Sequence, residues 1–167
     1  SFTGGIVGGM ATVEASATIG TEEATGQQGI TVRGLQTVVL SATETVVYGD
    51  LSSTSIITAT VTLSDGTPAW EGMDVEFNTD LGTFTESSSG VYSTTTDASG
   101  RATATFSGGL DGGTAEITAT ANVSSTGATS QPLSIEVLGL DAVALSTSAS
   151  NILADGVSTV ELQAVVT

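Results

Sequence analysis

The chain has 167 residues, of which 18 are acidic and 2 are basic, so its formal net charge at pH 7 is −16. A surface this acidic repels nucleic-acid phosphates and anionic lipids, which argues against both as partners. The sequence has no cysteine and no histidine, which excludes disulfides, thiol chemistry and zinc–thiolate sites and removes the commonest general base.

In chain order, alternating apolar and polar residues predict a series of short strands. The expected strands are residues 38–43, 55–64, 73–78, 91–96, 102–107, 114–123 and 133–138. Glycine, serine and aspartate cluster between them, as in Ser64-Asp65-Gly66 and Ser99-Gly100. Turns at this spacing, with strands rich in threonine, valine and isoleucine, predict an all-β protein built as two packed antiparallel sheets.

A comparison of the chain with itself reveals a repeat. Phe2, Gly4, Gly8 and Ala15 recur at Phe106, Gly108, Gly112 and Ala119, always 104 positions later. One inserted residue near Pro132 then moves the offset to 105, and Val38, Asp50 and Val61 recur at Val143, Asp155 and Val166. The chain is therefore expected to hold parts of three copies of one unit.

This repeat divides the chain into residues 1–34, the C-terminal part of a preceding unit, 35–139, a complete unit, and 140–167, the first strands of a following unit. The two partial units could in principle complete each other between neighbouring molecules. Together, however, they lack the counterparts of residues 63–105, and a sandwich without those middle strands would leave much of its core open to water. We therefore expect a window from a longer tandem array.

Three stretches give the complete unit a family resemblance: SIITATVTLSDGTPAWEGMDVEF from Ser55, TTDASGRATATF from Thr95, and ILADGVSTVELQAVVT from Ile152. The order of these motifs resembles that of group 1 bacterial immunoglobulin-like domains, the modules of intimin- and invasin-type surface proteins. The resemblance implies immunoglobulin-like antiparallel β-sandwich repeats in tandem. The sequence departs from it at Tyr48-Gly49-Asp50, where Ala-Asp-Gly is expected.

Carboxylates are the only plentiful reactive groups. Glu71, Asp74 and Glu76 surround one predicted strand, where the expected interpretation is a solvated sheet face rather than a catalytic pair. Serine has no histidine to activate it, and no Gly-x-Ser-x-Gly motif is present. The chain is therefore not expected to be an enzyme, and no catalytic or cofactor-binding residue is assigned.

Calcium is the one ion for which the sequence offers ligands, since it prefers oxygen atoms supplied by turns. The candidates are Asp50, Asp97, Asp141 and Asp155, at turns or near the boundary between units. The alternative is that these aspartates cap their own turns. Trp70, on a predicted loop between Pro68 and Gly72, is expected to cover the end of the sandwich, the alternative being an exposed contact residue.

The predicted function is that of a structural and adhesive spacer in a bacterial cell-surface or secreted protein of many repeats. Its partners would be neighbouring repeats of the same protein, with no membrane insertion in this segment, since no run of 18 apolar residues occurs. Residues 136–141 pass from one unit to the next with almost no linker, which predicts a semi-rigid rod. The alternatives are a self-assembling extracellular filament or sheath, in which copies of the chain would bind one another, and a virion fibre module.

Overall fold

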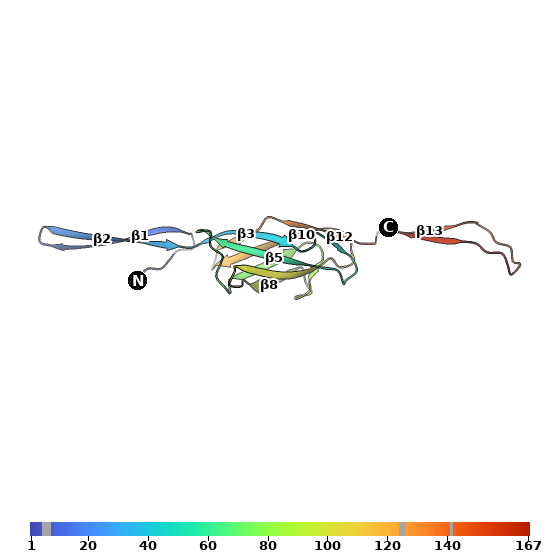
Figure 1. Cartoon of the computed structure of the whole chain (residues 1–167), viewed down its shortest axis with the longest axis horizontal. Helices are drawn as coiled ribbons and strands as arrows, with labels where there is room; N and C mark the ends of the chain where they lie inside the picture. Colours follow the sequence, from blue (N-terminus) through green and yellow to red (C-terminus); the bar gives the residue numbers. More distant parts are fainter. Residues whose placement is uncertain (5–7, 124–125, 141) are drawn as a thin grey trace.

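The computed structural model describes residues 1–4, 8–123, 126–140 and 142–167, and the regular elements in this part of the chain are all strands (Figure 1). A β-sandwich occupies the middle of the chain. Its strands are β3 (Leu35–Ala42), β4 (Val46–Tyr48), β5 (Thr54–Leu63), β6 (Asp74–Thr79), β7 (Thr83–Phe84), β8 (Val91–Thr95), β9 (Arg101–Ser107), β10 (Gly113–Val123), β11 (Thr126–Thr129) and β12 (Leu133–Leu138).

Two sheets form this sandwich. One has the order β4-β12-β10-β6-β8, with β11 also paired to β10, and the other has the order β3-β5-β9-β7. The pairs are antiparallel except β4 with β12, which is parallel. The expected all-β fold of packed antiparallel sheets is confirmed.

The core lies between the two sheets and is built by alternation along each strand. In β5, Ile57, Ala59 and Val61 are fully buried, while Thr58 and Thr60 on the opposite face are half-buried. Phe77, Phe84 and Phe106 meet at the centre, with ring centroids 6.0 and 6.4 Å from that of Phe84. In a chain without disulfides, this aliphatic and aromatic packing supplies the main stabilisation.

A two-stranded hairpin lies at each end of the sandwich along the long axis of the molecule (Figure 1). One pairs β1 (Gly9–Ile19) with β2 (Glu22–Val32), and the other pairs β13 (Val143–Thr147) with β14 (Leu162–Val166). No helix in the described part of the chain is long and apolar enough to cross a membrane.

The hairpins repeat the pairing of the sandwich strands. Val143 pairs with Val166 and Thr147 with Leu162, just as Val38 pairs with Val61 and Ala42 with Ile57 between β3 and β5. Likewise, Ala17 pairs with Ala24 as Ala121 pairs with Ala128 between β10 and β11. The second strand of the first hairpin is continuous, whereas Ser130, Gln131 and Pro132 separate β11 from β12.

The hairpins also expose side chains whose counterparts in the sandwich are buried. Val143 and Val166 are 65% and 55% exposed, whereas Val38 and Val61 are 5% and 0% exposed. Each hairpin therefore presents an apolar face that corresponds to one inner wall of the sandwich.

Each of the seven predicted strands is present, with ends shifted by a few residues at most. Within the sandwich, three further strands are not among those predicted: β4, β7 and β11. They have only two to four residues each, which is too short for an alternating pattern to be recognised.

Candidate functional site at the joint between hairpin and sandwich

The chain passes from the first hairpin to the sandwich through a very short connection. Strand β2 ends at Val32 and β3 begins at Leu35, so only Arg33 and Gly34 lie between them. A two-residue connection restricts the angle between the elements it joins, unlike a flexible glycine- and serine-rich linker. We call the region formed by Gly8, Arg33, Gly34, Ser64 and Asp65 the proximal joint.

The turn between β5 and β6 folds back onto this connection. The backbone N–H of Gly34 donates to Ser64 Oγ at 3.2 Å, and the backbone N–H of Ser64 donates to the carbonyl oxygen of Gly34 at 2.9 Å. Both hydrogen bonds join the connection to a turn that lies some 30 residues later, so they hold the entry of the sandwich to the end of the hairpin.

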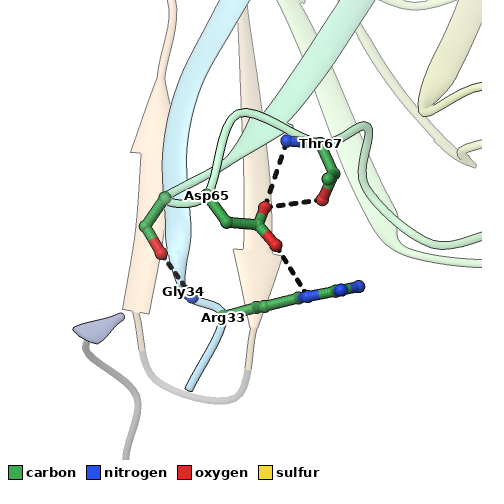
Figure 2. A network of polar contacts seen from close by, with 5 residues as sticks. Arg33, Gly34, Asp65 and Thr67 are labelled. Atoms are coloured by element: carbon green, nitrogen blue, oxygen red, sulfur yellow. Dashed lines mark hydrogen bonds and ion pairs between the residues drawn. The ribbon is translucent and has the colours of Figure 1, made fainter. Parts of the chain in front are cut away.

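An ion pair lies next to these hydrogen bonds (Figure 2). Arg33 Nε is 2.7 Å from Asp65 Oδ2, and Asp65 Oδ1 accepts hydrogen bonds from the backbone N–H and the side-chain hydroxyl of Thr67. The hydrogen bonds from Thr67 and the charge of Arg33 lower the pKa of Asp65. Because Arg33 is 60% exposed, solvent screens its charge, and the ion pair orients the joint more than it stabilises it.

A glycine completes the joint from the hairpin side. A Cβ atom placed on Gly8 would lie 2.0 Å from Ser64 Oγ and 2.8 Å from the backbone nitrogen of Gly34. Only a residue without a side chain allows this approach. The hairpin, the connection and the turn are therefore in close contact at one point.

Turn-capping bonds surround the described calcium candidates. Asp50 accepts hydrogen bonds from the backbone N–H groups of Ser52 and Ser53 and from the Ser53 hydroxyl, and Asp155 accepts the corresponding bonds from Val157 and Ser158. Asp97 accepts the backbone N–H groups of Ser99 and Arg101.

These bonds favour the ionised carboxylates. Hydrogen bonds from the Ser53 and Ser52 backbones lower the pKa of Asp50 to about 2, and bonds from the Ser158 side chain and backbone and the Val157 backbone lower the pKa of Asp155 to about 2. Backbone bonds also lower the pKa of Asp97. The described residues form no group of three metal-ligating side chains, and Asp141 lies outside them. Calcium binding stays a prediction.

The remaining acidic candidates lie on the surface. Asp74 and Glu76 share the exposed face of β6, with Val75 buried between them, so the predicted solvated face is confirmed. Trp70 is 48% exposed, whereas its neighbours Ala69 and Met73 are each 2% exposed. Ala69 and Met73 are therefore buried at this end of the core, whereas about half of Trp70 is exposed to solvent.

The sequence patterns indicated a turn at Ser64-Asp65-Gly66 but did not single out its role at the joint. The contacts of Arg33 and Gly34 with that turn depend on tertiary structure, which the spacing of residues does not encode. One signal was present: Arg33 is one of only two basic residues in the chain.

The chain is similar to solved adhesin structures. It shares 27% identity with the Yersinia pseudotuberculosis adhesin InvE, with a TM-score of 0.51 over 80% of this chain and 35% of that one. The D0-D1 domain of intimin shows 17% identity and a TM-score of 0.44 over 78% of this chain and 64% of that one. No family model and no curated protein matches. The chain thus spans about a third of the InvE structure.

Proposed function

Because this β-sandwich is a bacterial immunoglobulin-like domain of the intimin and invasin type, we propose that the chain is a spacer segment of a longer surface or secreted protein. In this role each sandwich adds length to the protein. It is connected to the next unit by a joint without a flexible linker. The domain would act outside the cell or at its surface, and no step of a chemical reaction is assigned to it.

One observation carries this proposal: the two hairpins reproduce the strand registers of the complete sandwich. The β13–β14 pairing follows that of β3–β5 residue by residue, and the β1–β2 pairing follows that of β10 with β11 and β12. The recurrence of the same register supports the division of the chain into residues 1–34, 35–139 and 140–167, as three units of a tandem array. In such arrays each unit contacts mainly its neighbours.

The proximal joint supports the semi-rigid character of the rod. Gly8 and Gly34 lie against Ser64, and two hydrogen bonds cross the connection. A rod of this kind would hold another part of the protein away from the cell surface, and the high negative charge would limit clumping of neighbouring rods.

The experiment that tests this function is imaging of the native material by electron microscopy, with antibodies against residues 35–139. We expect label on the outer surface of intact cells, along thin rods that stand apart from one another. Label confined to the cell interior would contradict the proposal. Ordered lateral contacts between labelled rods would instead favour the self-assembling filament or sheath.

A further inference from the structure

Two adjoining hollows lie at the far end of the sandwich, where β12 finishes, and the larger of them is apolar. Gly112, Val137, Leu138, Gly139 and Leu140 line one hollow, and a second continues from it between Tyr48 and Leu110. Tyr48, Leu110 and Leu138 are 62%, 63% and 42% exposed there. We call the region of Gly112, Leu138, Gly139 and Leu140 the distal joint, since the chain leaves the sandwich here for the second hairpin.

The distal joint has the same backbone arrangement as the proximal joint. Gly112 and Gly139 are the repeat counterparts of Gly8 and Gly34. A Cβ on Gly112 would lie 3.0 Å from the backbone nitrogen of Gly139, much as a Cβ on Gly8 would lie 2.8 Å from that of Gly34. The two glycines of each pair therefore approach each other in the same way.

In the described part of the chain, the contact made by Ser64 is present at the proximal joint and not at the distal joint. At the proximal joint, Ser64 lies against the glycine pair and exchanges two hydrogen bonds with Gly34. Among the described residues, Gly139 has no corresponding pair of bonds. The distal joint thus has the receiving surface of the proximal joint without the turn that fills it.

The end of the second hairpin corresponds to the part of the sandwich that comes just before this turn. Thr167 and Ala142 exchange backbone hydrogen bonds at 2.9 and 3.0 Å, at the position where Thr62 pairs with Thr37 in the sandwich. In the sandwich, the turn with Ser64 follows β5 directly. The counterpart of that turn would follow β14.

The side chains at the two joints differ in chemistry. The counterpart of Arg33, which pairs with Asp65, is Leu138. A carboxylate placed against Leu138, Leu110 and Tyr48 would lose water without gaining a cation. The surface therefore fits a turn that carries a small hydroxyl residue at the position of Ser64 and an apolar residue at that of Asp65.

We propose that the distal joint is the docking surface for the turn that follows the counterpart of β5 in the next repeat, with a hydroxyl side chain on Gly139 and an apolar one on Leu138. This inference rests on the proposed tandem arrangement. It adds which segment of the next repeat binds the distal joint and which side chains that segment carries. The two joints of one sandwich then differ: the proximal joint includes an ion pair that salt screens, and the distal joint is apolar and has no such pair among the described residues.

The test uses the full chain extended after Thr167 by a second copy of residues 63–139, which completes the final repeat because Thr167 is the counterpart of Thr62. A second version carries Asp65→Leu in the appended copy only. Amide hydrogen exchange is followed at Gly139, with Gly34 in the same molecule as the internal reference for an occupied joint.

We expect exchange at Gly139 to be at least about tenfold slower in the extended chain than in the 167-residue chain, and slower still in the Asp65→Leu version. In the matched control, appended Ser64→Gly, the slowing at Gly139 is lost while the ladder amides of the appended sandwich stay protected.

Unchanged exchange at Gly139 beside a protected appended sandwich would overturn the docking surface and leave the spacer role, which imaging decides, intact. Equal exchange at Gly139 in the version with Asp65 and the version with Asp65→Leu in the appended copy would overturn the apolar chemistry proposed for the docking surface. An appended repeat that does not fold would contradict the equivalence of the repeats on which the inference rests.

Discussion

Leu51 holds a backbone conformation that suits glycine, with a φ of 61°. Its counterpart in the second hairpin is Gly156, at a φ of 73°. The departure from Ala-Asp-Gly therefore lies one residue later than predicted, at Gly49-Asp50-Leu51, where the turn shape is unchanged and a strained residue occupies the last position. Leu51 is 67% exposed, so its side chain adds little packing to offset that strain.

We predict that Leu51→Gly raises the free energy of unfolding by about 0.5–1 kcal/mol, because the relief of strain exceeds the added chain entropy of glycine. Urea denaturation measures the change. The control is Ser52→Gly at the next position, where φ is not positive and the substitution is expected to destabilise. A loss of stability in Leu51→Gly would show that the turn is not strained.

The lowered pKa of Asp50 predicts that the stability of the fold depends on pH. Its folded pKa of about 2 lies below the value of about 3.9 for an unfolded aspartate. The stabilisation is therefore fully present above pH ~4 and is lost as the pH falls towards 2. We expect Asp50→Asn to be less stable than the wild type at pH 7, with a difference that shrinks over that range. Urea midpoints measured from pH 7 to 2 test this, and a constant difference would contradict it.

Adding a single methyl group at Gly8 tests how closely the proximal joint is packed. A methyl group in Gly8→Ala would collide with Ser64 and the backbone of Gly34, whereas a methyl group on Gly9 would meet nothing within 4 Å. We predict that Gly8→Ala accelerates amide exchange at Gly34 by about tenfold or more, and that Gly9→Ala does not. Equal exchange in both variants would show that the joint is loose.

At the scale of elements, the residue inserted near Pro132 interrupts one strand. Ser130 lies in the gap between β11 and β12 and is 6% exposed. Its Oγ accepts the backbone N–H of Ala119 at 3.0 Å, and its own N–H donates to the carbonyl oxygen of Ala119 at 2.9 Å. The hydroxyl thus replaces one bond that an uninterrupted ladder would supply.

We predict that Ser130→Ala lowers the free energy of unfolding by about 1–3 kcal/mol, because it leaves the N–H of Ala119 buried without a partner. The control is Ser134→Ala, which removes only an exposed hydrogen bond to Glu116 and should change stability by less than about 0.5 kcal/mol. Urea denaturation measures the free energy of unfolding of both variants. Equal losses of stability would mean that water replaces Ser130 as the partner of the Ala119 N–H.

Much of the element level could be predicted from the sequence, and the reasons are visible in β5. The alternation from Ser55 to Leu63 is regular because one face of this strand is buried. The repeat was also visible, because Phe106, Val38 and the paired glycines recur. The short strand β4 and the contact of Ser64 with Gly34 could not be predicted, since both depend on neighbours distant in sequence rather than on a local pattern.

At the scale of the whole molecule, the described chain is elongated, with hairpin, sandwich and hairpin in line (Figure 1). The apolar faces of the hairpins, with Val143 and Leu145 65% and 70% exposed, need sandwich partners to be shielded from water. In the proposed array, the strands of the neighbouring units supply them. The joints then determine whether the array is a rod or a flexible string.

Residual dipolar couplings of the backbone amides test this most directly, because they report the orientation of each element in one frame. If the proximal joint is rigid, couplings from β1 and β2 and those from β3 to β12 fit a single alignment tensor with equal magnitude. Couplings from the hairpin that are averaged towards zero, beside full-sized couplings from the sandwich, would contradict a rigid joint.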